Sequence, residues 1–171
     1  WYGADHVDNA TTAIAGPLSG GYLGVNSTTS TITNGALGVI ETSGVFASAI
    51  GTTSLLLNNA GIVRDTAAIF GAILTTTLQA GSTNSGTITG SIAAFATDDF
   101  DLANSGTIIG GVIGISANNG LTFANSGTVS ADLRGIQAGN ANITNFGTIA
   151  AARGSGRQAI NPQAIAPIVT T

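Results

Sequence analysis

The chain has 171 residues, a net charge of −4 and only 7% charged residues, whereas hydrophobic residues make up 43% of it. Four arginines and no lysine leave too little positive charge for a surface that binds nucleic acid. The absence of cysteine excludes disulfides and thiolate metal sites. The apolar runs fall short of the about 20 residues of a membrane-spanning helix, so no transmembrane segment is expected.

Residues 1–29 form the first segment and lack the repeat that follows. The only tryptophan, Trp1, lies here beside Tyr2. We predict that the segment is either a cap over the first coil or an interface with another subunit, with Trp1 and Tyr2 as assembly residues. His6, between Asp5 and Asp8, is a weak metal-site candidate because it is a single histidine, and no metal site is predicted.

Residues 30–156 contain a recurring phrase, Asn-Ser-Gly-Thr-Ile or a close variant of it. It begins at Asn84, Asn104, Asn125 and Asn145, and weaker copies begin at Asn34 and Asn59. Successive copies lie 20 to 25 residues apart. A period of this length is typical of solenoids, in which each repeat is one coil that buries its inner face only by stacking on its neighbours.

Apolar residues follow each repeated Asn at fixed distances, with small or polar residues between them. The predicted core residues are Ile88, Ile108, Val129 and Ile149 at the fourth position and Phe95, Ile115 and Ile136 at the eleventh. Val112 and Leu133 occupy the eighth position and are expected to face inward too. Alternation with a period of two indicates short β-strands. We therefore predict an all-β fold, a parallel β-helix (β-solenoid) with coils of about 20–25 residues and irregular terminal segments.

The Asn and Gly of each phrase are predicted to form the coil corners, because both residue types tolerate the positive φ of a tight turn. These corner residues are Asn84, Gly86, Asn104, Gly106, Asn125, Gly127, Asn145 and Gly147. Asn side chains repeated at one corner are expected to form an amide ladder along the stack. The threonines that follow are expected to form an outward column of Thr87, Thr107, Thr128 and Thr148.

Residues 157–171 form an extended C-terminal tail without charge after Arg157. Its prolines disfavour a regular central strand, and the end of a solenoid is an unpaired edge that templates association. We predict that the tail adds a strand to a neighbouring subunit. The assembly residues predicted here are Pro162, Ile165, Pro167, Ile168 and Val169.

The repeated phrase resembles the passenger repeats of bacterial autotransporters and related exported β-helix adhesins. The matching stretches are 102–108, 123–129 and 143–149, and the resemblance covers about residues 30–150. It implies a right-handed coil, export, and an extracellular location at the bacterial cell surface.

No catalytic constellation is recognised, and neither an enzyme activity nor a cofactor is predicted. The acidic cluster Asp98, Asp99 and Asp101 is interpreted as a solvated turn, because no second coil places acids beside it. An ice-binding surface would need a second threonine column, but the positions two residues on hold Thr89, Ile109, Ser130 and Ala150.

The hypothesis is therefore a structural, non-enzymatic exported protein that self-assembles end to end, through the solenoid ends and the tail, into a cell-surface filament or layer. Its partner is another copy of the same chain, and this head-to-tail contact builds an open homopolymer. The alternative is an autotransporter-like adhesin that binds host or glycan ligands. Ice binding has less support.

Overall fold

The computed structural model describes the backbone of residues 11–14, 17–18, 23–24, 29–43, 48–67, 71–152, 158–165 and 169–170, and the side chains of residues 29–43, 48–67 and 71–152. Every regular element in these ranges is a β-strand. The strands are β1 Thr11–Ile14, β2 Pro17–Leu18, β3 Leu23–Gly24, β4 Ser30–Asn34, β5 Val39–Thr42, β6 Ile50–Asn59, β7 Ile62–Asp65, β8 Gly71–Leu78, β9 Thr83–Asn84, β10 Thr87–Ala96, β11 Phe100–Asn104, β12 Thr107–Asn125, β13 Thr128–Ala131, β14 Arg134–Asn145, β15 Thr148–Ala151, β16 Gln158–Ile165 and β17 Val169–Thr170.

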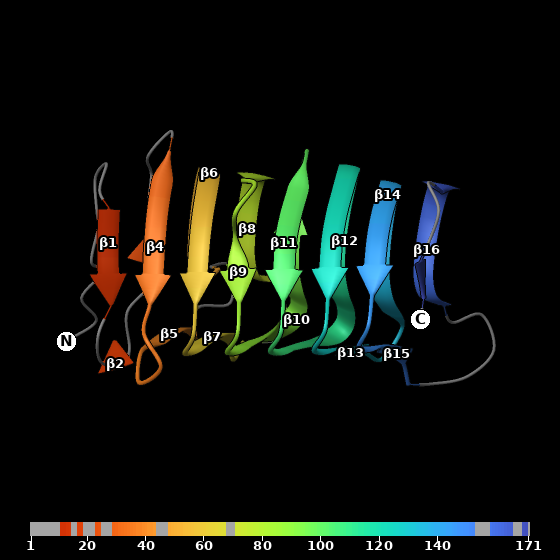
Figure 1. Cartoon of the computed structure of the whole chain (residues 1–171). Coiled ribbons are helices and arrows are strands. Elements are labelled where there is room, and N and C mark those ends of the chain that lie inside the picture. The colour runs from red at the N-terminus through yellow and green to blue at the C-terminus, as the bar shows by residue number, and fades with distance from the viewer. Residues whose placement is uncertain are drawn as a thin grey trace.

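The strands stack side by side along one axis, from β1 at one end to β16 at the other (Figure 1). Each strand pairs in parallel with the equivalent strand one turn earlier and one turn later, and the well-described part makes about five turns. A parallel strand cannot be followed by a tight hairpin to its partner, so the chain must travel around the coil before it returns. The predicted parallel β-solenoid is confirmed, and its handedness stays a prediction.

Each turn contributes to three faces of the stack. The Asn face carries β1, β4, β9, β11, β17 and the ends of β6, β12 and β14. The Thr face carries β2, β5, β7, β13, β15 and the starts of β10 and β12. The third face carries β3, most of β8 and β16, and the remaining parts of β6, β10, β12 and β14. The last residues of β8 and β16 reach the Asn face. We call the set of residues that pair at one level of a face a rung position.

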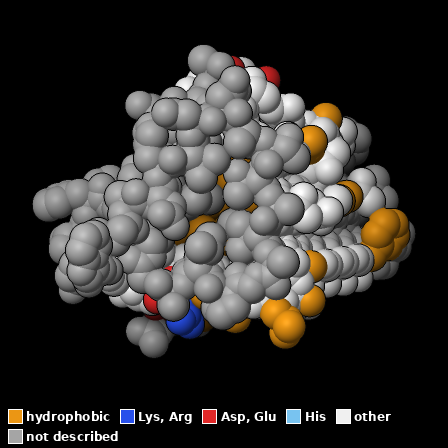
Figure 2. All heavy atoms as spheres, turned by 90° about the vertical axis from the view of Figure 1, so that its left-hand side faces the viewer, with side chains coloured by type: hydrophobic (Ala, Val, Ile, Leu, Met, Phe, Trp, Pro, Cys, Tyr) orange, Lys and Arg blue, Asp and Glu red, His pale blue; other side chains and the backbone are white. Residues whose placement is uncertain are grey.

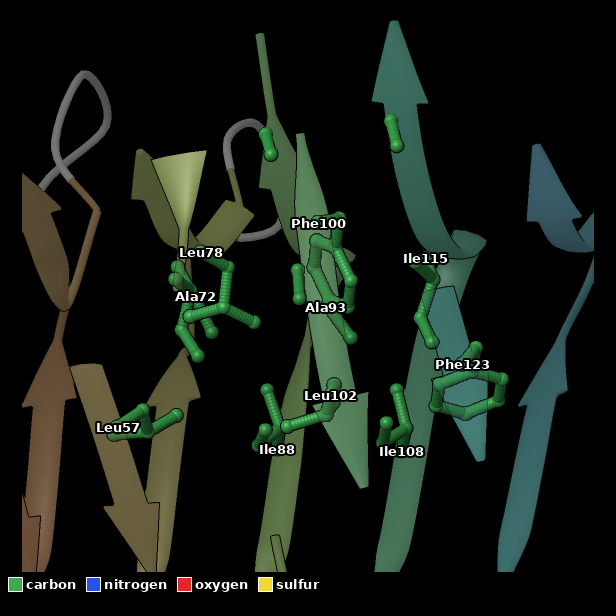
Figure 3. Packing of buried hydrophobic residues seen from close by; sticks show 14 of the residues in the cluster. Leu57, Ala72, Leu78, Ile88, Ala93, Phe100, Leu102, Ile108, Ile115 and Phe123 are labelled. Atoms are coloured by element: carbon green, nitrogen blue, oxygen red, sulfur yellow. The ribbon is translucent and has the colours of Figure 1, made fainter. Parts of the chain in front are cut away.

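The core is a column of apolar side chains that runs through the centre of the stack (Figure 3). Ile88 and Ile108 pair with each other on the Thr face, and both are fully buried. The largest buried side chains, Phe100 and Phe123, lie at different rung positions in successive coils. Because the two rings lie at different rung positions, both fill the core, and no single rung position has to hold two stacked rings.

Five of the seven predicted core residues are buried, namely Ile88, Ile108, Ile115, Val129 and Ile136. Ile149 is half-buried. Phe95 was assigned to the core and is only half-buried, so that prediction is wrong. Its rung position pairs it with Ser116, whereas the preceding Ala94 pairs with Ile115.

The error has a physical cause in the unequal lengths of the coils. Gly90 pairs with Gly110, but Ile92 pairs with Ile113, so the later coil holds one more residue at this corner. Because side chains alternate between the two faces of a strand, a shift of one residue exchanges inside for outside. The distance of a residue from the repeated Asn therefore no longer predicts whether its side chain faces the core once the chain has passed this corner.

The same corner accounts for a second wrong expectation, at the eighth position. Val112 is 42% exposed and Leu133 is 37% exposed, although both were expected to face inward. Longer insertions are placed at the corners in the same way. Arg64 to Gly71 spans seven positions where the paired Thr89 to Ile92 spans three.

Both irregular terminal segments contribute strands to the stack. Within residues 1–29, β1, β2 and β3 pair with β4, β5 and β6, so they trace one more coil. Within residues 157–171, β16 pairs with β14 of the same chain, and this part of the tail continues the solenoid. The role of the tail as an intersubunit strand stays a prediction.

Replacing Ile108 by Ala tests the assignment of inside and outside. Ile108 is fully buried, and its truncation should lower the free energy of unfolding by about 2–5 kcal/mol. The matched control is Ile109→Ala, because the adjacent side chain is exposed and its loss should cost less than about 1 kcal/mol. Equal losses for the two variants in urea unfolding would contradict the assignment.

Candidate functional site: the asparagine ladder and its two ends

The repeated asparagines form a continuous line of side-chain hydrogen bonds at the corner between the Asn face and the Thr face. This asparagine ladder consists of Asn34, Asn59, Asn84, Asn104, Asn125 and Asn145. In each step the Nδ2 group donates to Oδ1 of the next Asn along the chain, at 2.7 to 2.8 Å. The first five asparagines are buried.

The ladder has a fixed direction, because each Nδ2 group also donates to a carbonyl oxygen. Asn104 Nδ2, for example, lies 3.2 Å from the carbonyl oxygen of Gly106. A carbonyl oxygen only accepts, so the nitrogen must occupy this side of the amide. The donors therefore point toward the C-terminal end of the stack, and the acceptors point toward the N-terminal end.

The structure places a bend at Ser85–Gly86, Ser105–Gly106, Ser126–Gly127 and Phe146–Gly147, directly after a ladder Asn. The predicted reason for Gly at these corners is wrong, because Gly81 is the one glycine with positive φ among the described residues. Space is the actual constraint. A Cβ added to Gly106 would lie 2.2 Å from the carbonyl oxygen of Gly86, and one added to Gly127 would lie 2.1 Å from that of Gly106.

The Thr column lies on the Thr face, where Thr87, Thr107, Thr128 and Thr148 occupy one rung position. The first two side chains are half-buried and the last two are exposed. The neighbouring column is mixed, because Thr89 pairs with Ile109 and Ser130 pairs with Ala150. This face lacks the regular double threonine array of the ice-binding alternative.

Charge is sparse over the described residues. In the view of the N-terminal end, the charged side chains that are visible among the described residues appear as small, separate spots (Figure 2). Glu41 and Arg64 form an ion pair between adjacent coils of the Thr face. No three His, Asp, Glu or Cys side chains within the described ranges come together in a way that could hold a metal ion.

The acidic cluster lies at the corner between the third face and the Asn face. Asp98 accepts a hydrogen bond from Nδ2 of Asn119 at 3.0 Å, and Asp99 accepts one from the backbone N–H of Gly120 at 3.1 Å. The two carboxylates therefore link their coil to the next one. Asp101 is half-buried beside a groove of about 390 Å³ that Asp99 also lines.

The N-terminal end of the ladder carries an unpaired acceptor. Asn34 is fully buried, and its Oδ1 has no donor among the described residues. Ile14 of β1 occupies the rung position beyond it. An isoleucine side chain has no polar hydrogen, so it cannot act as the missing donor. Leaving such an acceptor buried and unpaired costs about 1–3 kcal/mol.

The C-terminal end of the ladder carries a spare hydrogen-bond donor. Asn145 Nδ2 donates to the carbonyl oxygen of Gly147 at 3.1 Å, and within the described residues its second hydrogen has no acceptor. Nearby Ile149 is half-buried, whereas its counterparts in earlier coils are buried. Phe146 replaces the corner serine of the earlier coils and is 64% exposed. Two apolar side chains, Phe146 and Ile149, are therefore accessible near the C-terminal end of the ladder.

A groove of about 230 Å³ runs along the same corner, beside the ladder. Its floor is formed by small side chains of successive coils, including Ser85, Ser105 and Ser126. Phe146 lines it as well, at the last of these corners. The lining residues carry no charge, so the groove is suited to a neutral ligand.

The predicted assembly residues lie in the two terminal segments. Trp1, Tyr2, Pro167 and Ile168 are outside the described residues. Pro162 and Ile165 lie on β16, and Val169 lies on β17, where the backbone alone is described. Asn34 and Asn145 were not predicted as the two ends of the ladder, although they are the first and last of the repeated asparagines in the sequence.

Comparison with models of protein families, with curated proteins and with solved structures gave no match to this chain. The parallel β-solenoid thus rests on the structure, and the resemblance to autotransporter passengers rests on the repeated phrase. None of the described elements is a helix with the length and apolar character needed to cross a membrane.

Replacing Asn104 by Ala tests the energetic role of the ladder. The change removes the acceptor of Asn84 and the donor to Asn125 in the buried interior. It should lower the free energy of unfolding by about 1–3 kcal/mol for each orphaned group. The control is Asn142→Ala, on an exposed position of the Asn face. An unfolding midpoint of the Asn104 variant equal to that of the control would show that the ladder contributes no stability.

Proposed function

We propose that this protein is a structural, non-enzymatic building block that associates end to end with copies of itself into a filament or layer at the bacterial cell surface. The observation that carries the proposal is the polarity of the asparagine ladder. One end holds an unpaired acceptor on Asn34 and the other holds a spare donor on Asn145. When two copies stack in the same direction, the donor of Asn145 in one copy meets the acceptor of Asn34 in the next.

The chemistry of the stack supports the same function. Like-charge repulsion between copies is weak, because the chain has only 12 formally charged Asp, Glu, Lys and Arg residues. An open solenoid end also presents unpaired strand edges, which template addition of further strands. A head-to-tail contact of this kind does not close on itself, and repeated addition gives a filament. The cell-surface location rests on the resemblance of the repeats to exported passengers.

A second candidate function is an adhesin that binds a neutral glycan along its side. The observation that favours it is the uncharged groove beside the ladder, where Phe146 offers an exposed aromatic ring and the corner serines offer hydroxyl groups. One exposed aromatic side chain among the described residues is a small platform for sugars, so this function ranks second.

The purified chain should form uniform filaments as its concentration rises, and the mass measured by light scattering should increase accordingly. Deleting residues 160–171 removes part of β16 and should suppress this growth. Electron microscopy separates the two functions, because long fibres support assembly and discrete short rods support the adhesin. A chain that stays monomeric at every concentration, with or without the deletion, contradicts assembly.

A further inference from the structure

We propose that assembly proceeds by exchange of the N-terminal coil. The C-terminal coil of a second copy replaces β1, β2 and β3, so that the asparagine ladder runs from Asn145 of one copy to Asn34 of the next. This inference rests on the proposed end-to-end assembly and names its interface. The partner is a second copy of the same chain, and the contact is made of strands in register.

Each end of the ladder supplies the hydrogen-bonding group that the other end lacks. Asn34 Oδ1 is a buried acceptor without a donor among the described residues. Asn145 Nδ2 has a second hydrogen without an acceptor in the same ranges. Joining the ends repeats the interaction of Asn125 Nδ2 with Asn145 Oδ1, which is 2.7 Å long. No new type of contact is needed.

The described strands of the coil that must leave are short and pair at few positions. β1 pairs with β4 at four positions, and β2 and β3 pair with their neighbours at two positions each. β17, which covers Thr144 and Asn145, also pairs at two positions. In the middle of the stack, by contrast, β12 and β14 pair at ten positions. The described strands of the N-terminal coil thus pair at eight positions, whereas β12 pairs with β13 and β14 at fourteen.

The strands of the second copy also fit the rung positions that they take over. Ile160 of β16 pairs with Ile136, and the same rung position leads coil by coil to Ile50. Leu23 of β3 pairs with Ile50 in the single chain. The first part of β16, residues 158–162, can therefore stay on its own β14 and take the place of β3 in the next copy. Ala164 and Ile165 must leave, because Ile165 shares its rung position with Ser30 of the next copy.

On the Thr face, β15 of one copy can take the place of β2 in the next copy. Thr148 and Ile149 of β15 occupy the rung positions that lead back to Val39 and Ile40 of β5. In the single chain the two residues of β2 cover this part of β5. In the exchanged arrangement β15 covers it instead. Ile149, which is half-buried in the single chain, then gains an apolar neighbour.

Paired cysteines test the interface directly, because the native chain contains no cysteine. Thr33 and Thr144 each precede a terminal ladder Asn and occupy one rung position on the Asn face. Within one chain five rungs separate them, about 24 Å, which is too far for a disulfide. Across the proposed interface they are neighbours at about 4.8 Å. The variant T33C/T144C should give a ladder of covalent oligomers on a non-reducing gel.

The control pair is A103C/A124C, because Ala103 and Ala124 are exposed and pair directly within one chain. It should form an intrachain disulfide and no covalent oligomers, which shows that the rung spacing permits the bond. Filaments of T33C/T144C without cross-links would overturn the exchanged interface and leave end-to-end assembly standing. A protein that forms neither filaments nor cross-links would overturn both.

A second variant places the missing donor inside the chain. Ile14 lies at the rung position beyond Asn34, so Ile14→Asn can donate to Asn34 Oδ1 as the other ladder residues do. The N-terminal coil is then held in place, and the concentration needed for assembly should rise roughly tenfold, the effect expected of one hydrogen bond. Ile14→Val, which adds no donor, should assemble as the native chain does. An Ile14→Asn protein that assembles at the native concentration would contradict the exchange.

Discussion

The structure depends on one constraint, the pairing of a buried amide in each coil. Burying an Asn side chain is costly unless its donor and acceptor groups find partners. In this chain each partner is the same residue one turn away, at 2.7 to 2.8 Å. That requirement fixes the spacing of the coils and the register of the strands on both sides of the corner. Gly106 and its equivalents follow from it, because the backbone of successive coils approaches too closely for a Cβ.

The constraint also determines where the sequence can vary. Coils of unequal length stay in register at the ladder because the additional residues are placed at the corners. Between Asn59 and Asn84 the chain takes 25 residues, and between Asn84 and Asn104 it takes 20, yet both pairs are adjacent in the stack. The apolar column remains continuous across the longer and shorter coils. The corner that carries the ladder thus keeps one spacing, while coils of different length are accommodated at the other two corners.

Much of the fold could be predicted from the sequence, because the Asn that must pair in each coil is itself part of the repeated phrase. The spacing of the asparagines indicates the coil, and residues close to them, such as Ile88 and Ile108, are buried as expected. The prediction failed at Phe95, where counting continued past a corner of variable length. The ends of the ladder were also missed, because whether an amide lacks a partner depends on which residue lies one coil away. The pairing of Ile14 with Asn34 supplies this information for the N-terminal end.

A ladder with a direction makes the molecule a polar rod, with a donor at one end and an acceptor at the other. The central claim, that this polarity continues from copy to copy, is tested most directly by the axial rise per subunit in a cryo-electron microscopy reconstruction of the filament. Six ladder rungs from Asn34 to Asn145 predict a rise of about 29 Å when the next copy follows at once. A rise of about 34 Å or more, which leaves room for one or both terminal coils between the ladders, would contradict the claim.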